Sequence, residues 1–151
     1  MSDASESTPS HKGPIRSRAE KATHRRLLEG MTYEVIPLKN VHDQAGFLPP
    51  GSTVSVTCSP ARTIDDTLDL CATFAELGHT TIPHFAARMC EGEEHVDRIA
   101  RRVDEQGIRK VFVVGGDDDP RGPFSDAAGF LRSLLDRRPG IDVVGIGSYP
   151  D

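Results

Sequence analysis

The sequence predicts an α/β fold with a parallel sheet, because strand-like and helical segments alternate strictly along the chain. From residue 53 onward, four runs of β-forming residues are separated by three segments with apolar residues at helical spacing. Alternation at this spacing is typical of βαβ units, which place their strands in parallel. The continuous apolar run at 111–114 is expected to be a strand buried on both faces, as in many parallel sheets.

Composition limits the classes of function. The 151 residues suffice for one ordinary domain, and the formal net charge of -5 gives no indication of a nucleic-acid partner. No apolar run approaches the ~20 residues of a membrane span, and no signal peptide opens the sequence. The odd number of cysteines and their lack of metal-ligand spacing predict reduced thiols in a cytoplasmic protein: Cys58, Cys71 and Cys90.

The N-terminal segment differs from the rest of the chain. Residues 1–16 are rich in serine, proline and charge, so we expect disorder there. Residues 17–29 predict a short basic helix with Leu27 and Leu28 as its apolar anchors. The expected organisation is therefore a disordered or weakly helical tail over 1–30 and a folded domain over 31–151.

The first half of the domain contains two strands and a helix. Residues 33–37 form a short apolar run interrupted by Glu34, and residues 53–59 are rich in β-branched side chains. Thr63 is a candidate N-cap for the helix that follows, and Gly78 is its expected end. The residues predicted to face the core recur at helical spacing: Ile64, Leu68, Cys71, Ala72 and Ala75.

The second half repeats the alternation. Residues 80–86 predict a strand, whose Pro83 requires a strand end or a bulge. A helix follows with Val96, Ile99, Ala100 and Val103 on one face, and the strand at 111–114 comes next. Ser125 or Asp126 caps a last helix, and residues 142–149 predict the fifth strand. The apolar face of that last helix is expected to contain Ala127, Leu131, Leu134 and Leu135.

Residues with chemical potential collect where the predicted strands end. In α/β barrels and open α/β sheets, the carboxyl ends of parallel strands converge on the site of the chemistry. Each residue also has a structural explanation: a solvated carboxylate, a β-former, a structural histidine, an acidic turn or a core cap. Glu34, set between apolar neighbours, is in addition a candidate for a raised pKa. The five residues are Glu34, Thr57, His84, Asp117 and Tyr149.

Short motifs at these strands give the chain a resemblance to a known family. They occur in the same order and at similar spacing as in the methylenetetrahydrofolate reductase family, whose N-terminal half the segment 31–151 resembles. The motifs are Tyr-Glu-Val-Ile-Pro-Leu-Lys at 33–39, Val-Ser-Val-Thr at 54–57, Pro-His at 83–84, Gly-Ile at 107–108, Val-Gly-Gly-Asp at 114–117 and Tyr-Pro at 149–150.

The resemblance implies a fold and an activity. The fold would be a partial (β/α)8 TIM barrel, its first five parallel strands preceded by the disordered tail. The activity would be reduction of 5,10-methylenetetrahydrofolate to 5-methyltetrahydrofolate in one-carbon metabolism and methionine supply, with FAD as cofactor and NADH or NADPH as co-substrate. Glu34 would donate the proton that opens the folate's five-membered ring, and Asp117 would stabilise the cationic iminium. The implied cofactor contacts are Thr57, His84, Gly116, Asp117 and Tyr149.

The sequence also departs from the family pattern, and alternatives remain open. Gly115 replaces an arginine that would offset Asp117, while Asp118 and Asp119 add negative charge near an expected flavin diphosphate. A full barrel takes ~250 residues, so the chain is expected to be a fragment. The main alternative is a non-catalytic half-barrel that binds a partner or a ligand, and its open strand edges would favour pairing with another chain or aggregation. A third alternative is a Mg²⁺ site at residues 117–119 in a lyase.

Overall fold

A computed structural model of the chain describes residues 17–41 and 45–147. The chain divides into two compact units, Met1–Gly30 and Met31–Asp151. In the first unit, helix α1 (Arg18–Glu29) begins after Ser17, whose hydroxyl accepts the Glu20 N–H while the Glu20 carboxylate accepts the Ser17 N–H. This capping box stabilises α1 locally. None of the residues of α1 is buried.

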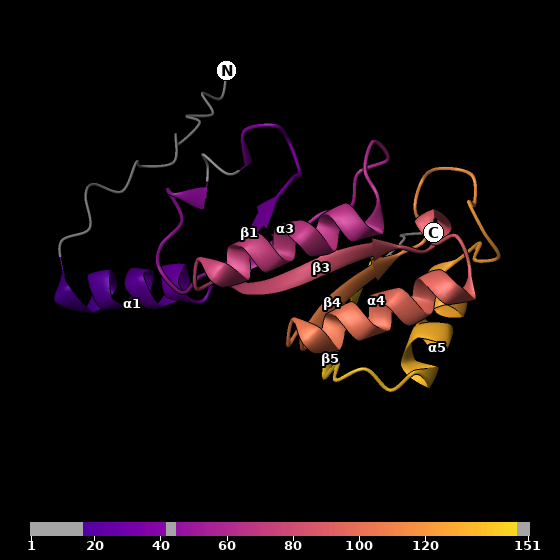
Figure 1. The fold of residues 1–151 in the computed structure, drawn as a ribbon. Helices are drawn as coiled ribbons and strands as arrows, with labels where there is room; N and C mark the ends of the chain where they lie inside the picture. The colour runs from indigo at the N-terminus through magenta and orange to yellow at the C-terminus, as the bar shows by residue number, and fades with distance from the viewer. Residues whose placement is uncertain (1–16, 42–44, 148–151) are drawn as a thin grey trace, which may run out of the picture. The chain divides into compact units, whose positions relative to one another are not determined.

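The second unit contains a five-stranded parallel sheet in the order β1-β2-β3-β4-β5 (Figure 1). The strands are β1 (Thr32–Val35), β2 (Thr53–Val56), β3 (Thr80–Ala86), β4 (Lys110–Val114) and β5 (Val143–Ile146). Because the spatial order equals the chain order, each connection moves one strand further in the same direction. Connections of one hand then place their helices on one face of the sheet. The predicted α/β fold with parallel strands is confirmed.

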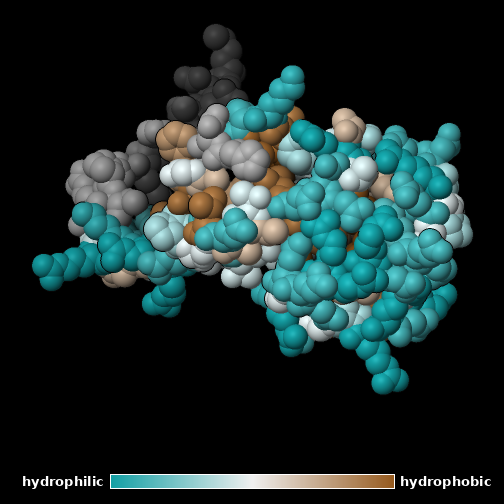
Figure 2. All heavy atoms as spheres, viewed as in Figure 1, coloured by the Kyte–Doolittle hydropathy of each residue, from teal (hydrophilic) through white to brown (hydrophobic). Residues whose placement is uncertain are grey.

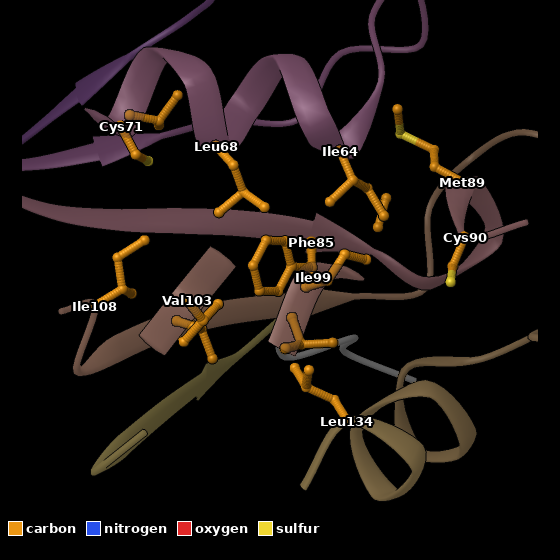
Figure 3. Packing of buried hydrophobic residues seen from close by; sticks show 14 of the residues in the cluster. Ile64, Leu68, Cys71, Phe85, Met89, Cys90, Ile99, Val103, Ile108 and Leu134 are labelled. Atoms are coloured by element: carbon orange, nitrogen blue, oxygen red, sulfur yellow. The ribbon is translucent and has the colours of Figure 1, made fainter. Parts of the chain in front are cut away.

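Among the described elements, three helices and a short 3-10 turn connect the strands from β2 to β5. They are α3 (Ile64–Glu76), η1 (Ala87–Met89), α4 (Glu93–Glu105) and α5 (Ala127–Asp136). Thr63 caps α3 in a capping box with Asp66, and Asp126 caps α5 by accepting the Gly129 N–H. Side chains from all three helices gather around Phe85 of β3 (Figure 3). The outward surfaces of α4 and α5 are hydrophilic (Figure 2). None of the described helices has the length and apolarity needed to cross a membrane.

Strand register divides the sheet into two unlike faces. The covered face, packed against the helices, carries side chains that are at most 1% exposed: Val54, Val56, Phe85, Val111 and Val113. The opposite face, called the open face below, carries residues of the alternate register. These are Glu34, Ser55, Ile82, His84, Phe112 and Val114, and all but Ser55 keep partial or full exposure. The expectation that strand 111–114 is buried on both faces is therefore wrong, because helices pack on one face of it.

Two details of the predicted helices and strands need correction. Ala75 is exposed and Leu135 is 41% exposed, whereas the larger Phe74 and Phe130 fill the core in their place. Pro83 lies in the interior of β3 rather than at an end or a bulge. Pairing with β2 ends at Pro83 and pairing with β4 begins at His84, so its missing N–H falls at the junction of the two ladders.

Candidate functional site on the open face

The centre of the open face is a hydrogen-bonded pair. Ser55 of β2 is paired in register with Glu34 of β1, so their side chains share the open face. The Oγ of Ser55 lies 2.6 Å from Nε2 of His84 on β3. Two predicted site residues, Glu34 and His84, are therefore brought to the same face, with Ser55 on the strand between them.

Burial affects the two predicted residues differently. Burial lowers the pKa of His84, and the nearby Glu34 carboxylate opposes that shift with its negative charge. The imidazole is therefore neutral at pH 7, when it can donate through one nitrogen and accept through the other. Glu34 itself is exposed, so the expected burial of its carboxylate is wrong. It lies on β1, an edge strand of the sheet, and points to the open face.

An aromatic contact fixes the other side of the imidazole. The ring of Phe112 lies 4.6 Å from the His84 ring, centroid to centroid, with 33° between their planes. The Phe112 ring in turn lies over the backbone of β5, since a Cβ added at Gly145 would come within 2.5 Å of Phe112 Cδ2. A side chain at 145 would thus displace the ring that supports His84.

Sequence reasoning missed Ser55, Phe112 and Gly145. The sequence pattern includes Phe112 in an apolar run and Gly145 in the last strand, and it predicts no role for either. One signal was present: Ser55 is a polar residue between two valines, Val54 and Val56, in a strand whose neighbours are buried. Its partner could not be identified, because contact with His84 depends on the register between β2 and β3.

Thr57 follows directly after β2. Its N–H donates to the carbonyl of Val35 at 3.0 Å, and its hydroxyl donates to the same carbonyl at 3.3 Å. The side chain therefore holds the ends of β1 and β2 together. Tyr149, the fifth predicted residue, lies outside the described residues.

A second cluster lies where β3 and β4 end. A pocket of about 180 Å³ lies there, and its lining contains Gly116 and Asp117 among the predicted residues. Gly116 has a φ of +97°, and an added Cβ would lie 3.2 Å from Ala86 Cβ, so a glycine is needed here. The lining residues are Cys58, Pro60, Ala86, Arg88, Met89, Val114, Gly116, Asp117 and Asp118.

Both arginines beside this pocket are bound to the protein's own acceptors. Arg88 donates from Nε to the Ser125 carbonyl at 2.9 Å and from Nη1 to the Gly116 carbonyl at 3.1 Å. Arg121 donates to the Pro60 carbonyl at 3.1 Å and lies 3.8 Å from the Asp118 carboxylate. These bonds hold the loop after β4 in place and occupy part of the guanidinium donors of both arginines.

The negative charge at this pocket also affects the pKa of the Cys58 thiol. Burial raises its pKa, a hydrogen bond with its backbone opposes the shift, and the charge of Asp117 raises the pKa further. Within residues 17–41 and 45–147, no group of three histidine, cysteine or carboxylate side chains is placed to hold a metal ion. The described residues therefore do not support the Mg²⁺ site considered for 117–119.

No family model matches the chain. The site must accordingly be interpreted from its own geometry: a carboxylate, a hydroxyl and a neutral imidazole on the open face, and an acidic pocket at the end of β4.

Proposed function

We propose that the protein is a reductase of 5,10-methylenetetrahydrofolate that forms 5-methyltetrahydrofolate at the open face. One observation carries the proposal: Glu34, Ser55 and His84 share the open face near the carboxyl ends of β1–β3. The β3 end also contributes Ala86 to the pocket that contains Asp117. This is where parallel α/β proteins place catalytic groups, and Glu34 and Asp117 are the residues to which the family resemblance gives catalytic roles.

The proposed reaction needs one proton and one hydride. Glu34 donates the proton to the ring nitrogen that leaves the methylene carbon, which opens the five-membered ring and leaves a cationic iminium. The carboxylate of Asp117 stabilises that cation. Reduced nicotinamide transfers a hydride to the iminium carbon, which becomes the methyl group. The exposed carboxyl group of Glu34 would regain its proton from solvent after each turnover.

The residues at the end of β4 do not fit the diphosphate of FAD. A diphosphate is bound by free cations or backbone N–H groups. Here Arg88 and Arg121 already donate to protein carbonyls, and Asp117 and Asp118 line the same pocket. The family's arginine is replaced by Gly115, which adds no charge. In this proposal the hydride therefore passes directly from NADH or NADPH to the folate.

The sheet order supports a partial (β/α)8 barrel as the framework of this site. Sequential parallel strands with helices on one face are the arrangement from which such barrels are built. In a barrel, the open face becomes the interior, and Glu34 and His84 lie toward its catalytic mouth. The proposed fold thus explains why one face of the sheet carries polar side chains.

A specific observation favours a second candidate, a non-catalytic half-barrel that self-associates. In the described part of β5, Val143 is 50% exposed and Ile146 is 66% exposed. Exposed apolar residues on an edge strand favour pairing with another chain. Sedimentation velocity of the purified chain tests this candidate, which requires a dimer at micromolar concentration.

The reductase proposal is tested with the full-length gene product and deuterated cofactor. Without added flavin, NADH or NADPH carrying deuterium at the transferred position should be oxidised only when methylenetetrahydrofolate is present. Direct transfer places the deuterium in the methyl group, which mass spectrometry detects. Failure to oxidise either cofactor contradicts the proposal. Turnover that occurs only with bound flavin, detected by its visible absorbance, contradicts direct transfer.

A further inference from the structure

We infer that Ser55 is a positioning residue: its hydroxyl donates to Nε2 of His84 and holds the imidazole in the tautomer with its proton on Nδ1. The Nδ1–H is then the group that His84 offers to a ligand on the open face. The hydrogen bond is an observation on this chain alone. The identity of the ligand, a folate, rests on the proposed function.

The geometry favours the hydroxyl as the donor. The Ser55 Oγ lies 2.6 Å from His84 Nε2, and among the described residues the hydroxyl has no other hydrogen-bond acceptor, so accepting from an Nε2–H would leave its own proton unpaired. Ser55 is only 7% exposed, which limits competition from water for its hydroxyl. Its neighbours Val54 and Val56 are fully buried, so the strand that carries the donor is fixed.

The remaining nitrogen of His84 is available for a ligand. Among the described residues, Nδ1 has no hydrogen-bond partner, while the ring packs against Phe112. Donation by Ser55 leaves Nδ1 protonated, because a neutral imidazole carries one proton. The open face then presents a donor on β3 and a carboxylate acceptor, Glu34, on β1. Such a pair suits a heterocycle that has both a ring acceptor and a donor.

His95 is fixed in the opposite tautomer and provides an internal reference. The N–H of Glu91 donates to Nδ1 of His95 at 3.2 Å, so the proton of the neutral ring lies on Nε2, which is 3.3 Å from the Asp65 carboxylate. Burial lowers the pKa of His95 as it does that of His84. Two neutral imidazoles in one chain are thus expected to differ in which nitrogen carries the proton.

The experiment is nitrogen-15 NMR of the histidine rings in the full chain at neutral pH. We expect His84 to show a protonated Nδ1 and His95 a protonated Nε2. Ser55→Ala should shift the tautomer populations and raise the pKa of His84, since the donor to its neutral form is lost. Ser55→Thr, which keeps a hydroxyl, should restore both. Ser52→Ala is the control, because it removes an equally short hydroxyl bond, to the Pro49 carbonyl at 2.6 Å, elsewhere in the fold.

A second measurement connects the tautomer to the ligand. Calorimetric titration with 5-methyltetrahydrofolate should give roughly tenfold weaker binding for Ser55→Ala, the effect of one lost hydrogen bond, and wild-type affinity for Ser52→Ala. A protonated Nε2 on His84 in the wild type, or equal affinity for both variants, contradicts the inference. No binding by the wild type contradicts the proposed function, while the ring spectra still decide the role of Ser55.

Discussion

The covered and open faces of the sheet come from the same strands but have different compositions. On β3, Phe85 points to the helices and is fully buried, whereas His84, one residue earlier, points to the open face and bonds Ser55. Alternation along a strand thus allows stability and chemistry to reside on adjacent residues. It follows that substitutions on the covered face should affect folding first, and substitutions on the open face should affect ligands first.

The largest expected difference in stability is between two phenylalanines. Phe85→Ala should lower the free energy of unfolding by about 3–5 kcal/mol, because it leaves a cavity in a fully buried core. Phe112→Ala, on the half-exposed side of β4, should lower it by less than half as much. Urea unfolding followed by circular dichroism measures both. Equal losses would mean that the two faces are not energetically distinct.

Thiol chemistry sharpens the comparison between the core and the strand-end pocket. Burial raises the pKa of Cys71 on α3 from 9.0 to about 12, which reduces its thiolate fraction at neutral pH roughly a thousandfold. Cys58 lines the pocket and is half-buried. Iodoacetamide should therefore modify Cys58 in the folded chain, and Cys71 only after unfolding, as peptide mass spectrometry can show. Modification of Cys71 at the rate of Cys58 would contradict the burial of α3.

The sequence was sufficient to predict the element order, the parallel strands and the cap at Thr63, because these depend on local patterns. It also placed Glu34 and His84 on β1 and β3, although His84 lies within β3 and not at its end. It did not predict which face each helix residue takes, and Ala75 was chosen where Phe74 is buried. The pairing of Ser55 with His84 depends on strand register, and the commitment of Arg88 to backbone carbonyls depends on loop geometry. Neither can be deduced from residue spacing.

The pH dependence of stability separates two histidines. Burial lowers the pKa of both His84 and His95 below the unfolded value of 6.5. Between the folded and unfolded pKa values the unfolded chain binds more protons, so the stabilisation present above pH 6.5 is lost as pH falls through the folded pKa. His84→Gln should remove part of this loss without affecting the part due to His95. Unfolding midpoints measured from pH 8 to pH 5 test this, and an unchanged profile would contradict the burial of His84.

A smaller effect is expected at the helix that covers the sheet. Thr63→Ala removes the side-chain cap of α3 and should cost about 1 kcal/mol of stability. Folate affinity should stay within about twofold, because loss of the cap should change the free energy of folate binding at the open face by less than about 0.5 kcal/mol. Ser17→Ala, the matched change at the cap of α1, should leave the unfolding of residues 31–151 unchanged. Thermal unfolding and calorimetry distinguish these outcomes. A tenfold loss of folate affinity in Thr63→Ala would show that the covered face and the open face are energetically coupled.

The most direct test of the account is the proton-donor role of Glu34. In the full-length gene product, Glu34→Gln should lower the rate of methylenetetrahydrofolate reduction by about a hundredfold or more, the usual contribution of a general acid. Its thermal stability should match that of Glu105→Gln, a control at an exposed carboxylate on α4. Such a loss of turnover in a folded variant is the result predicted here. Reduction within about threefold of the wild-type rate, well under 1 kcal/mol of barrier, would contradict it.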